Sequence, residues 1–369
     1  MADGAEHGLN TFEDLLIENQ TQLEQALEIM SGPLAVDTEF VRERTYYPQL
    51  CLLQISDAAT AVCVDCLAEL ELAPLRAQLL ERPILMHSGR QDLEIIWQTF
   101  GQLPAKLVDT QVAAGLLGMP PQIGYGELVD SRLAVKLDKS NSRRDWSKRP
   151  LSADGLRYAL DDVRYLIPLW QVLAEELEEL ERLEWLVEDC ERLLNPQLFD
   201  DPKQVFNKLK GLRRLRPESQ ACAYRLVLWR ETYAQKIDRP RRWVLADRAL
   251  LQIATQQPRT LNELAAIEEV GTRLVQREGE ALLNQIAAVA GIPPIKIPSP
   301  LNSEQRQNHK RLTQRVGQIA EDVGVRTEVL ATRSELETLV RGREPQRLAS
   351  GWRHDLLDAA DLLDSGCLN

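Results

Sequence analysis

The runs in this chain that are typical of β-strands all lie within its first 90 residues. Short apolar or β-branched runs, each bounded by Pro, Gly or polar residues, occur at 34–40, 49–56, 61–65 and 83–87. Apolar residues at a period near 3.6 indicate helices around 67–81, 90–100, 109–118 and 152–180. After Pro196 only helical patterns remain. The sequence therefore predicts an α/β domain, with three strands in close succession as an antiparallel meander, followed by all-α regions.

The length of 369 residues exceeds what one hydrophobic core normally organises, so several domains are expected. A proline-rich stretch divides the helical part and is typical of a stiff linker. We predict four segments: an α/β domain at 1–196, a helical domain at 203–290, a linker at 291–300 and a second helical domain at 301–369.

The two helical regions share an ordered set of matching residues. Val244-Leu245-Ala246-Asp247-Arg248 recurs as Val329-Leu330-Ala331-Thr332-Arg333. Further along, Gly271 and Arg273 match Gly351 and Arg353 at a slightly shorter spacing. Chance similarity between leucine-rich helices is the alternative, but matches on both sides of one short deletion favour a duplication.

Composition and charge restrict the class of protein. The first thirty residues have no basic start followed by an apolar core, and no later run reaches the ~20 apolar residues of a membrane span, so we expect a cytoplasmic protein without membrane contact. The net charge of −12 argues at face value against a nucleic-acid partner. Segments such as 203–216, with six basic residues and no acid, are nevertheless locally basic.

Two acids interrupt the apolar strand at 34–40. Side chains at i and i+2 of a strand project from the same face, so Asp37 and Glu39 should present two adjacent carboxylates. Such carboxylates repel each other unless they are neutralised, and a divalent cation with oxygen ligands is the natural candidate. A polar edge strand is the plainer alternative. A phosphatase with D-x-D followed by Thr fits poorly, because position 39 is Glu and position 41 is Val.

Three further residues are candidates for the same chemistry. Asp92 follows a glycine where a strand meets a helix, although the helix dipole alone would favour an acid there. Tyr158 and Asp162 are neighbours at i and i+4 of a helix, so that phenol and carboxylate can address one site. A surface tyrosine with a salt-bridged aspartate is the alternative, and Asp161 is the neighbouring acid most easily mistaken for the functional one.

D-x-E on a strand, an Asp at a later strand–helix junction and Y-x-x-x-D on a later helix occur here in that order. This set resembles the DEDD exonuclease superfamily. The segments 48–55, 138–140 and 145–151 are similar to the ribonuclease D family in particular, over the first ~195 residues. The run from Arg239 to Asp247 resembles the helicase-and-RNase-D C-terminal (HRDC) domain. The second helical copy lacks the Arg-Pro-Arg-Arg-Trp element.

The resemblance implies a ribonuclease H-like fold, with a mixed sheet flanked by helices, and a metal-dependent 3′-to-5′ exoribonuclease activity. It assigns two Mg²⁺ or Mn²⁺ ions to Asp37, Glu39, Asp92 and Asp162. Asp37 would bridge both ions, Glu39 and Asp162 would complete the site nearer the attacking water, and Asp92 would support the other ion. Tyr158, with an ordinary pKa of about 10, would orient the water rather than remove its proton.

The implied substrates are RNAs with single-stranded 3′ tails, such as tRNA precursors, and the implied products are 5′-nucleoside monophosphates. We expect a monomer with no obligate protein partner. The basic residues suited to phosphate, with an aromatic residue that could stack on a base, make a candidate RNA surface: Lys208, Lys210, Arg213, Arg214, Arg241, Arg242 and Trp243. A solvated basic helix face is the alternative.

Two other functions are compatible with parts of the sequence. A DNA exonuclease would use the same acids, because selectivity depends on contacts to the 2′-hydroxyl that the sequence does not reveal. A non-catalytic RNA-binding adaptor would have no reason to keep charged residues inside a strand.

Overall fold

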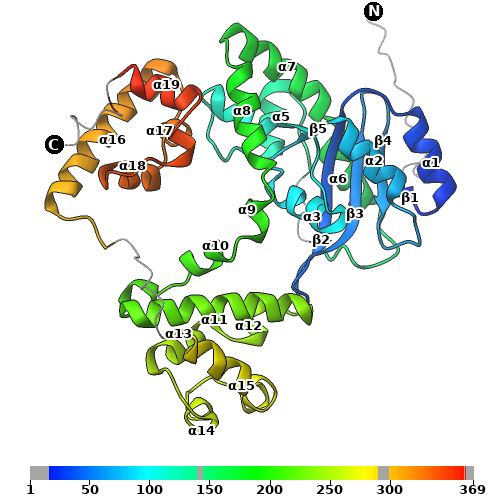
Figure 1. The fold of residues 1–369 in the computed structure, drawn as a ribbon. Helices are drawn as coiled ribbons and strands as arrows, with labels where there is room; N and C mark the ends of the chain where they lie inside the picture. Colours follow the sequence, from blue (N-terminus) through cyan, green and yellow to red (C-terminus); the bar gives the residue numbers. More distant parts are fainter. Residues whose placement is uncertain (1–15, 139–143, 290–298, 361, 363–369) are drawn as a thin grey trace, which may run out of the picture. The chain divides into compact units, whose positions relative to one another are not determined.

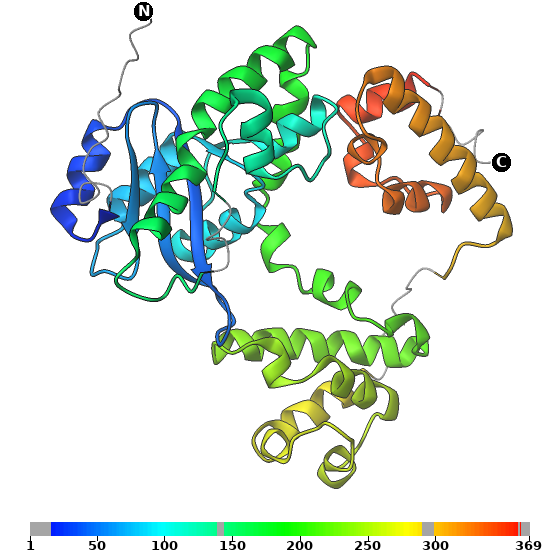
Figure 2. The ribbon, with the colours of Figure 1, turned by 180° about the vertical axis from the view of Figure 1, so that it is seen from behind.

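The computed structural model describes residues 16–138, 144–289, 299–360 and 362. The chain forms two compact units. The first contains the residues up to Val41, Leu50–Asn195 and the residues from Leu301 onward. The second contains Arg42–Gln49 and Pro196–Pro300. Each unit is described separately below, and both are drawn in Figure 1 and, from behind, in Figure 2.

The first unit contains a six-stranded mixed sheet, drawn in Figure 1, with the strand order β1-β4-β3-β2-β5-β6. β3 and β4 are antiparallel, whereas β2, β5 and β6 run parallel to one another. The strands are β1 (Leu16–Ile17), β2 (Leu34–Val41), β3 (Gln49–Ser56), β4 (Ala61–Asp65), β5 (Pro83–Met86) and β6 (Lys106–Asp109).

The four predicted strands correspond to β2, β3, β4 and β5, and the mixed α/β fold followed by helices is confirmed. The prediction missed two strands. β1 has only two residues, and the apolar part of β6 is just Leu107 and Val108 between Lys106 and Asp109, so neither shows an apolar run long enough to indicate a strand. Both lie at the edges of the sheet, where parallel pairing with β4 and with β5 places them.

Eight helices accompany the sheet in the described part of this unit before residue 196. The helical pattern predicted at 152–180 is two helices, because α6 ends at Arg164 and α7 starts at Leu166, with Pro168 in its first turn, where no helical N–H bond is lost. The helices are α1 (Gln20–Ile29), α2 (Ala73–Glu81), α3 (Arg90–Phe100), α4 (Thr110–Leu116), α5 (Tyr125–Leu133), α6 (Ala153–Arg164), α7 (Leu166–Glu179) and α8 (Leu183–Leu193).

Helix α6 packs against the sheet through its apolar side. Leu156, Ala159 and Leu160 pack with the buried residues of β3 and β4. Val163 packs with Ala35 of β2 and with the start of α7. Burial of this side fixes the rotation of α6 about its axis and therefore the direction in which its polar residues point.

The last helices of the chain, from Leu301 onward, belong to the same compact unit as the sheet. Arg182 of the α7–α8 connection donates to the backbone carbonyls of Leu116 (2.6 Å) and Val323. The indoles of Trp185 and Trp352 stack with their centroids 4.4 Å apart. These helices are α16 (Ser303–Val323), α17 (Thr327–Leu330), α18 (Arg333–Val340), the 3₁₀ helix η3 (Gln346–Leu348) and α19 (Trp352–Asp358).

The second unit is helical and has its own buried core around α11. The segment Arg42–Gln49, which connects β2 to β3, also belongs to it, since Tyr46 packs against this core. The backbone N–H groups of Tyr46 and Tyr47 donate to Asp238. Its helices are α9 (Gln197–Asp200), α10 (Pro202–Asn207), the 3₁₀ helix η2 (Leu212–Arg214), α11 (Pro217–Lys236), α12 (Arg241–Val244), α13 (Asp247–Gln256), α14 (Leu261–Ala265) and α15 (Thr272–Ala287).

The two helical regions repeat one succession of elements. A long helix (α11 or α16) precedes a four-residue helix (α12 or α17), a medium helix follows, and a last helix begins directly after Gly271 or Gly351. The residues that matched in the sequence occupy equivalent places in this succession, which supports duplication. Most of the linker predicted at 291–300 lies outside the described residues.

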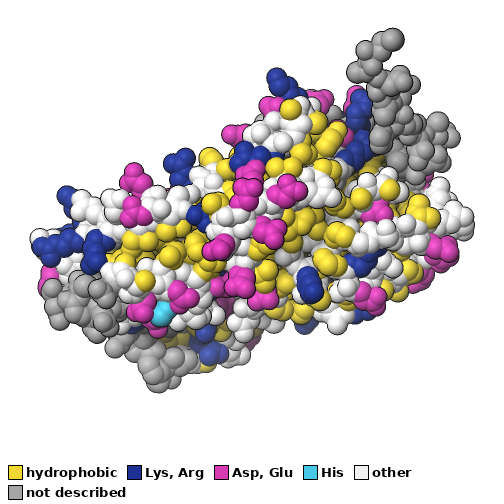
Figure 3. Space-filling view, turned by 90° about the horizontal axis from the view of Figure 1, so that it is seen from above, with side chains coloured by type: hydrophobic (Ala, Val, Ile, Leu, Met, Phe, Trp, Pro, Cys, Tyr) yellow, Lys and Arg dark blue, Asp and Glu magenta, His cyan; other side chains and the backbone are white. Residues whose placement is uncertain are grey.

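None of the helices in the described ranges has both the length and the apolar character needed to cross a membrane. On the face in Figure 3, acidic and basic side chains are interspersed with hydrophobic ones among the residues drawn in colour.

Candidate active site

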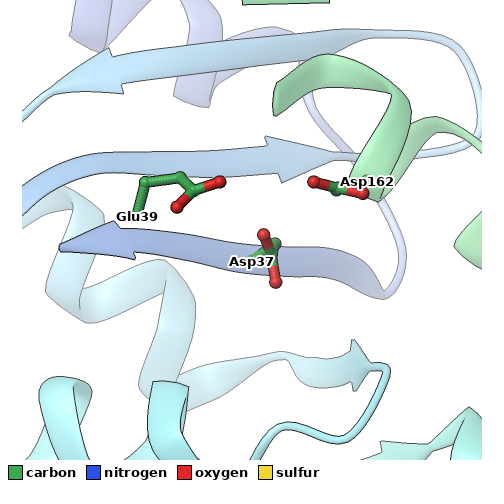
Figure 4. Close-up of side chains that lie close together, drawn as sticks. All are labelled: Asp37, Glu39 and Asp162. Atoms are coloured by element: carbon green, nitrogen blue, oxygen red, sulfur yellow. The ribbon is translucent and has the colours of Figure 1, made fainter. Parts of the chain in front are cut away.

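Strand β2 places Asp37 and Glu39 on one face of the sheet, as the i, i+2 spacing predicted. Ala35, two residues earlier, packs against Val163 and Ile167, so the two acids continue along the face that α6 and α7 cover. Figure 4 shows both carboxylates beside Asp162 of α6. One ligand oxygen from each of the three residues lies within 4.8 Å of the other two. A strand and a helix more than 120 residues apart in the sequence thus form one cluster.

Tyr158 lies one turn before Asp162 on α6, at the predicted spacing of four residues. Its hydroxyl hydrogen bonds with the Asp162 carboxylate, and this bond lowers the pKa of Asp162 against the larger opposing effect of burial. Burial and the nearby Asp162 charge raise the pKa of Tyr158. A phenol whose pKa is raised above its ordinary value of about 10 stays protonated near neutral pH and acts as a hydrogen-bond donor.

Asp92 reaches the same pocket from the first turn of α3. It is not one of the three residues whose ligand atoms lie within 4.8 Å of one another. Thr38, between the two acids of β2, donates to Asp92 with a distance of 2.5 Å between Oγ1 and Oδ1. The fourth predicted acid is therefore attached to β2 by a hydrogen bond and lies beside the cluster rather than inside it.

Burial raises the pKa of each acid in this pocket, and repulsion from nearby acids adds to it. Burial is the largest cause for Asp37, and the charges of Asp92, Asp162 and Glu39 add to it. The pKa of Glu39 is raised to about 8 and that of Asp162 to about 7, again mainly by burial. The pKa of Asp92 is also raised. The charged forms of these carboxyl groups are therefore disfavoured, and a bound cation would stabilise them.

The donor set fits a hard divalent ion. All the ligand atoms are carboxylate oxygens, which suit Mg²⁺, Mn²⁺ or Ca²⁺ and not the softer metals that prefer Cys or His. The strongest electrostatic effects on Asp37 and Glu39 come from other acids. These acids repel one another, and a bound divalent cation would neutralise that repulsion.

The pocket also contains side chains that sequence reasoning did not select. Thr38, Phe40, His87, Gln91 and Tyr125 line it together with the acids, in a volume of about 290 Å³. Both ring nitrogens of His87 are engaged, Nδ1 with Thr110 Oγ1 at 2.9 Å and Nε2 with the Ile123 carbonyl at 3.0 Å. The sequence indicated only that His87 ends a predicted strand. Its hydrogen-bond partners, Thr110 and Ile123, lie more than 20 residues later and could not be predicted.

The raised pKa values predict how the metal requirement depends on pH. Protons and metal ions compete for Glu39 and Asp162, so the Mg²⁺ concentration that gives half-maximal activity should fall as the pH rises from about 6 to about 8. Rates on 5′-labelled RNA, measured over a range of Mg²⁺ at each pH, check this. A requirement that does not change with pH would contradict it.

The same shifts predict the stability of the metal-free protein. An acid whose pKa is raised on folding contributes stability below its unfolded pKa, and this contribution is lost as the pH rises through the folded pKa. For Glu39 and Asp162, with folded pKa values of about 8 and about 7, the loss falls between roughly pH 4.5 and pH 8. The melting temperature in chelator should therefore decrease across that range, and metal should restore more stability at the alkaline end.

The candidate RNA-binding residues all lie in the second unit, but they are not equivalent. Lys208, Lys210 and Arg242 line one depression of about 740 Å³. Arg242 and Trp243 are exposed and line a second depression together with Arg241. Arg213 and Arg214 are exposed in η2 and line neither depression.

Arg241 differs from the others because its charge is paired inside the unit. Its guanidinium lies 3.1 Å from the buried carboxylate of Glu231 and over the ring of Tyr46, 5.5 Å from the centroid. Arg241 thereby helps to attach the segment Arg42–Gln49 to α11. This role inside the fold competes with the predicted role in RNA binding.

A mixed sheet with a carboxylate cluster on its helix-covered face, together with a separate helical unit, defines a class of metal-dependent nucleases with an accessory helical domain. The family models agree: residues 16–178 match a 3′-5′ exonuclease and residues 219–286 match an HRDC domain.

Similar proteins of known name narrow the class further. Ribonuclease D of Pseudomonas paraeruginosa (strain PA7) is 36% identical, over 89% of this chain and 90% of its own length. Ribonuclease D of Jannaschia sp. (strain CCS1) is 37% identical, over 88% of each chain. The crystal structure of Escherichia coli RNase D, an exoribonuclease involved in structured RNA processing, is 29% identical with a TM-score of 0.81 and covers 94% of this chain and 98% of that one. The chain belongs to the ribonuclease D family.

Membership confirms the activity that the sequence predicted. The chain is a 3′-5′ exoribonuclease, a phosphodiester hydrolase that acts on RNA and uses divalent metal.

Proposed function

We propose that this exoribonuclease removes nucleotides one at a time from single-stranded 3′ tails of structured RNAs, tRNA precursors among them, and releases 5′-nucleoside monophosphates. The observation that carries the proposal is the cluster of Asp37, Glu39 and Asp162, whose ligand atoms lie within 4.8 Å of one another on the sheet face. A site built from acids would repel the RNA backbone unless cations were bound in it. The cluster is therefore better suited to hydrolysing RNA with metal than to holding RNA alone, as an adaptor would.

In this proposal, two Mg²⁺ or Mn²⁺ ions are held by Asp37, Glu39, Asp92 and Asp162. Asp37 is the central ligand, since its pKa responds to the charges of all three other acids. The separation of Asp92 from the cluster suits support of a second ion rather than the first. When bound, the ions supply a nucleophilic water at neutral pH and offset the charge on the departing 3′ oxygen.

Tyr158 has the role of a hydrogen-bond donor in this proposal. Its raised pKa keeps its proton on the phenol, and its bond to Asp162 directs the hydroxyl toward the cluster. It orients the attacking water and does not remove the proton from it. The predominantly polar pocket around it leaves room for the terminal nucleotide.

Digestion of matched substrates tests the substrate class. One transcript carries a folded tRNA precursor with a short 3′ tail, a second ends flush at the helix, and a third has a DNA tail. We expect stepwise shortening of the RNA tail only, with 5′-nucleoside monophosphates identified by chromatography. Nucleoside 3′-monophosphates would contradict the proposed cleavage, and equal shortening of the DNA tail would contradict RNA selectivity.

The second unit supplies the proposed RNA-holding surface. Trp243 is the strongest candidate there, because its indole is 64% exposed and exposed tryptophan is a stacking platform for bases. We expect Trp243→Ala to weaken RNA binding about tenfold, which is about 1.4 kcal/mol and within the roughly 1–3 kcal/mol that one stacked base contributes, without changing the metal requirement. Leu261→Ala, a second exposed apolar side chain of this unit, is the control. Unchanged binding by the Trp243 variant in a filter or fluorescence assay would contradict the assignment.

We also propose the domain organisation derived from the sequence: an exonuclease domain at 1–196, an HRDC domain at 203–290, a linker at 291–300 and a diverged HRDC-like region at 301–369. The match of residues 219–286 to HRDC and the repeated succession of helices support it. A monomeric state and a cytoplasmic location stay predictions.

A further inference from the structure

Asp109 is a buried acid that the proposed mechanism does not use. It is the last residue of β6 and the N-cap of α4, and its side chain is 2% exposed. Its carboxylate accepts from the backbone N–H groups of Gln111 (2.8 Å) and Val112 (3.3 Å), which is ordinary capping of its own helix. It also accepts from Ser88 N (3.0 Å) and Gly89 N (2.9 Å), about 20 residues earlier in the chain. The second pair of bonds is not needed to cap α4.

The turn at Ser88 and Gly89 depends on this external support. Ser88 has a φ of 58°, in the left-handed region that non-glycine residues adopt only at a cost. Gly89 is the N-cap of α3 and provides no side-chain cap. A Cβ at Gly89 would lie 2.6 Å from Met86 Sδ and 2.7 Å from Met86 Cβ, so the turn is tightly packed against the end of β5. Parallel pairing of Met86 with Asp109 sets the register that brings the carboxylate to the turn.

The turn determines where α3 begins, and α3 carries Asp92 in its first turn. The Leu93 N–H bonds to the Gly89 carbonyl at 2.9 Å, so the helical ladder around Asp92 starts at the residue that Asp109 holds. On the other side, Thr38 binds the Asp92 carboxylate. Asp92 is thus held through its side chain by β2 and through its backbone by Asp109.

From this arrangement we infer that Asp109 is a positioning residue of the nuclease: it fixes the start of α3 and thereby the place of the Asp92 carboxylate in the metal site. The inference rests on the proposed role of Asp92 as a metal ligand. Replacing a residue that orients a metal ligand without binding the metal typically lowers metal affinity or activity by about 10–100-fold.

Asp57 provides a matched control. It is 6% exposed, and its carboxylate also accepts from three backbone N–H groups, those of Ser31, Ala59 and Thr60, at 2.9, 2.9 and 2.7 Å. The turn that it supports, between β3 and β4, carries none of the proposed site residues. Asp57→Asn and Asp109→Asn each replace a buried carboxylate that accepts from backbone N–H groups, three for Asp57 and four for Asp109, and only the second should affect the metal site.

The test uses the full chain with Asp109→Asn, Asp57→Asn and Asp92→Asn. Two quantities are measured: the rise in melting temperature caused by Mn²⁺ without RNA, and the Mg²⁺ concentration for half-maximal RNA digestion. We expect Asp109→Asn to raise that concentration about tenfold and to reduce the Mn²⁺-induced rise. Asp57→Asn should leave both quantities within about twofold of wild type, even if its metal-free protein melts earlier.

Each outcome has one meaning. If Asp92→Asn raises the metal requirement and Asp109→Asn does not, the positioning role is wrong and the proposed metal site stands. If Asp92→Asn leaves the metal requirement unchanged, the proposed site itself is wrong at Asp92. Should Asp109→Asn fail to fold, Gly89→Ala perturbs the same turn from the other side and should raise the metal requirement in the same way. An unchanged requirement in that variant would overturn the inference.

Discussion

Asp37→Asn is expected to slow RNA digestion by at least about 10³-fold at saturating Mg²⁺. Charge stabilisation by bound metal contributes several kcal/mol to such reactions, and each 1.36 kcal/mol is about tenfold in rate. Asp37 is the acid whose pKa is raised by burial and by all three other acids, so its removal affects the whole cluster. Single-turnover rates on 5′-labelled RNA measure the effect.

The same substitution should stabilise the metal-free protein. Asparagine removes a charge that is repelled by Asp92, Asp162 and Glu39, so the melting temperature in chelator should rise while the stabilisation by Mg²⁺ disappears. Asp161→Asn is the control, because Asp161 is adjacent to the cluster but pairs with Arg164 at 3.2 Å. We expect that variant to digest RNA within a few-fold of wild type. A lower melting temperature for metal-free Asp37→Asn would show that repulsion from the other acids does not destabilise the fold.

Arg353→Ala is expected to lower the free energy of unfolding by about 3–5 kcal/mol, the usual cost of removing one partner of a buried ion pair. Arg353 is 3% exposed, and its Nη2 lies 2.7 Å from Asp189 on α8. Its Nε donates to the Val329 carbonyl at 2.9 Å, and its guanidinium lies over Trp352, 4.0 Å from the ring centroid. Truncation would leave the Asp189 carboxylate largely buried without its partner.

Denaturant titration measures this loss, with two comparisons. Arg333→Ala removes an ion pair with Glu337 whose arginine side chain is 85% exposed, and it should cost less than about 1 kcal/mol. Adding Asp189→Ala to Arg353→Ala should recover part of the stability, because the unpaired carboxylate is then removed as well. A cost for Arg353→Ala no larger than that for Arg333→Ala would show that α19 does not stabilise this unit through the pair.

The geometry of the candidate site was predictable because the residue spacings that form it are short. Two residues apart on a strand and four apart on a helix are periodicities that any chain must obey, and Asp37, Glu39, Tyr158 and Asp162 follow them. The prediction of a divalent cation followed from the unfavourable free energy of placing two carboxylates in an apolar strand. The relation between Asp92 and the cluster could not be predicted, because it depends on a hydrogen bond from Thr38 and on the turn that Asp109 holds.

Parts of the fold were not predictable because they depend on contacts distant in sequence. The segment Arg42–Gln49 looks like an ordinary strand connection, but Tyr46 bonds to Glu231 and Asp238 in the helical unit. The same contacts explain why Arg241 has a structural partner that the basic run Arg239–Arg242 did not reveal. Composition misled in a similar way, since a net charge of −12 says nothing of where the 44 basic residues lie.

Digestion of a 5′-labelled RNA with a short 3′ tail, comparing wild type with Asp37→Asn in Mg²⁺, Mn²⁺ and chelator, tests whether the carboxylate cluster is the catalytic site. Wild type should produce a ladder that shortens from the 3′ end with either metal, and no ladder should form with chelator or with the variant. Metal-dependent shortening that persists in Asp37→Asn would contradict the assignment of the carboxylate cluster as the catalytic site.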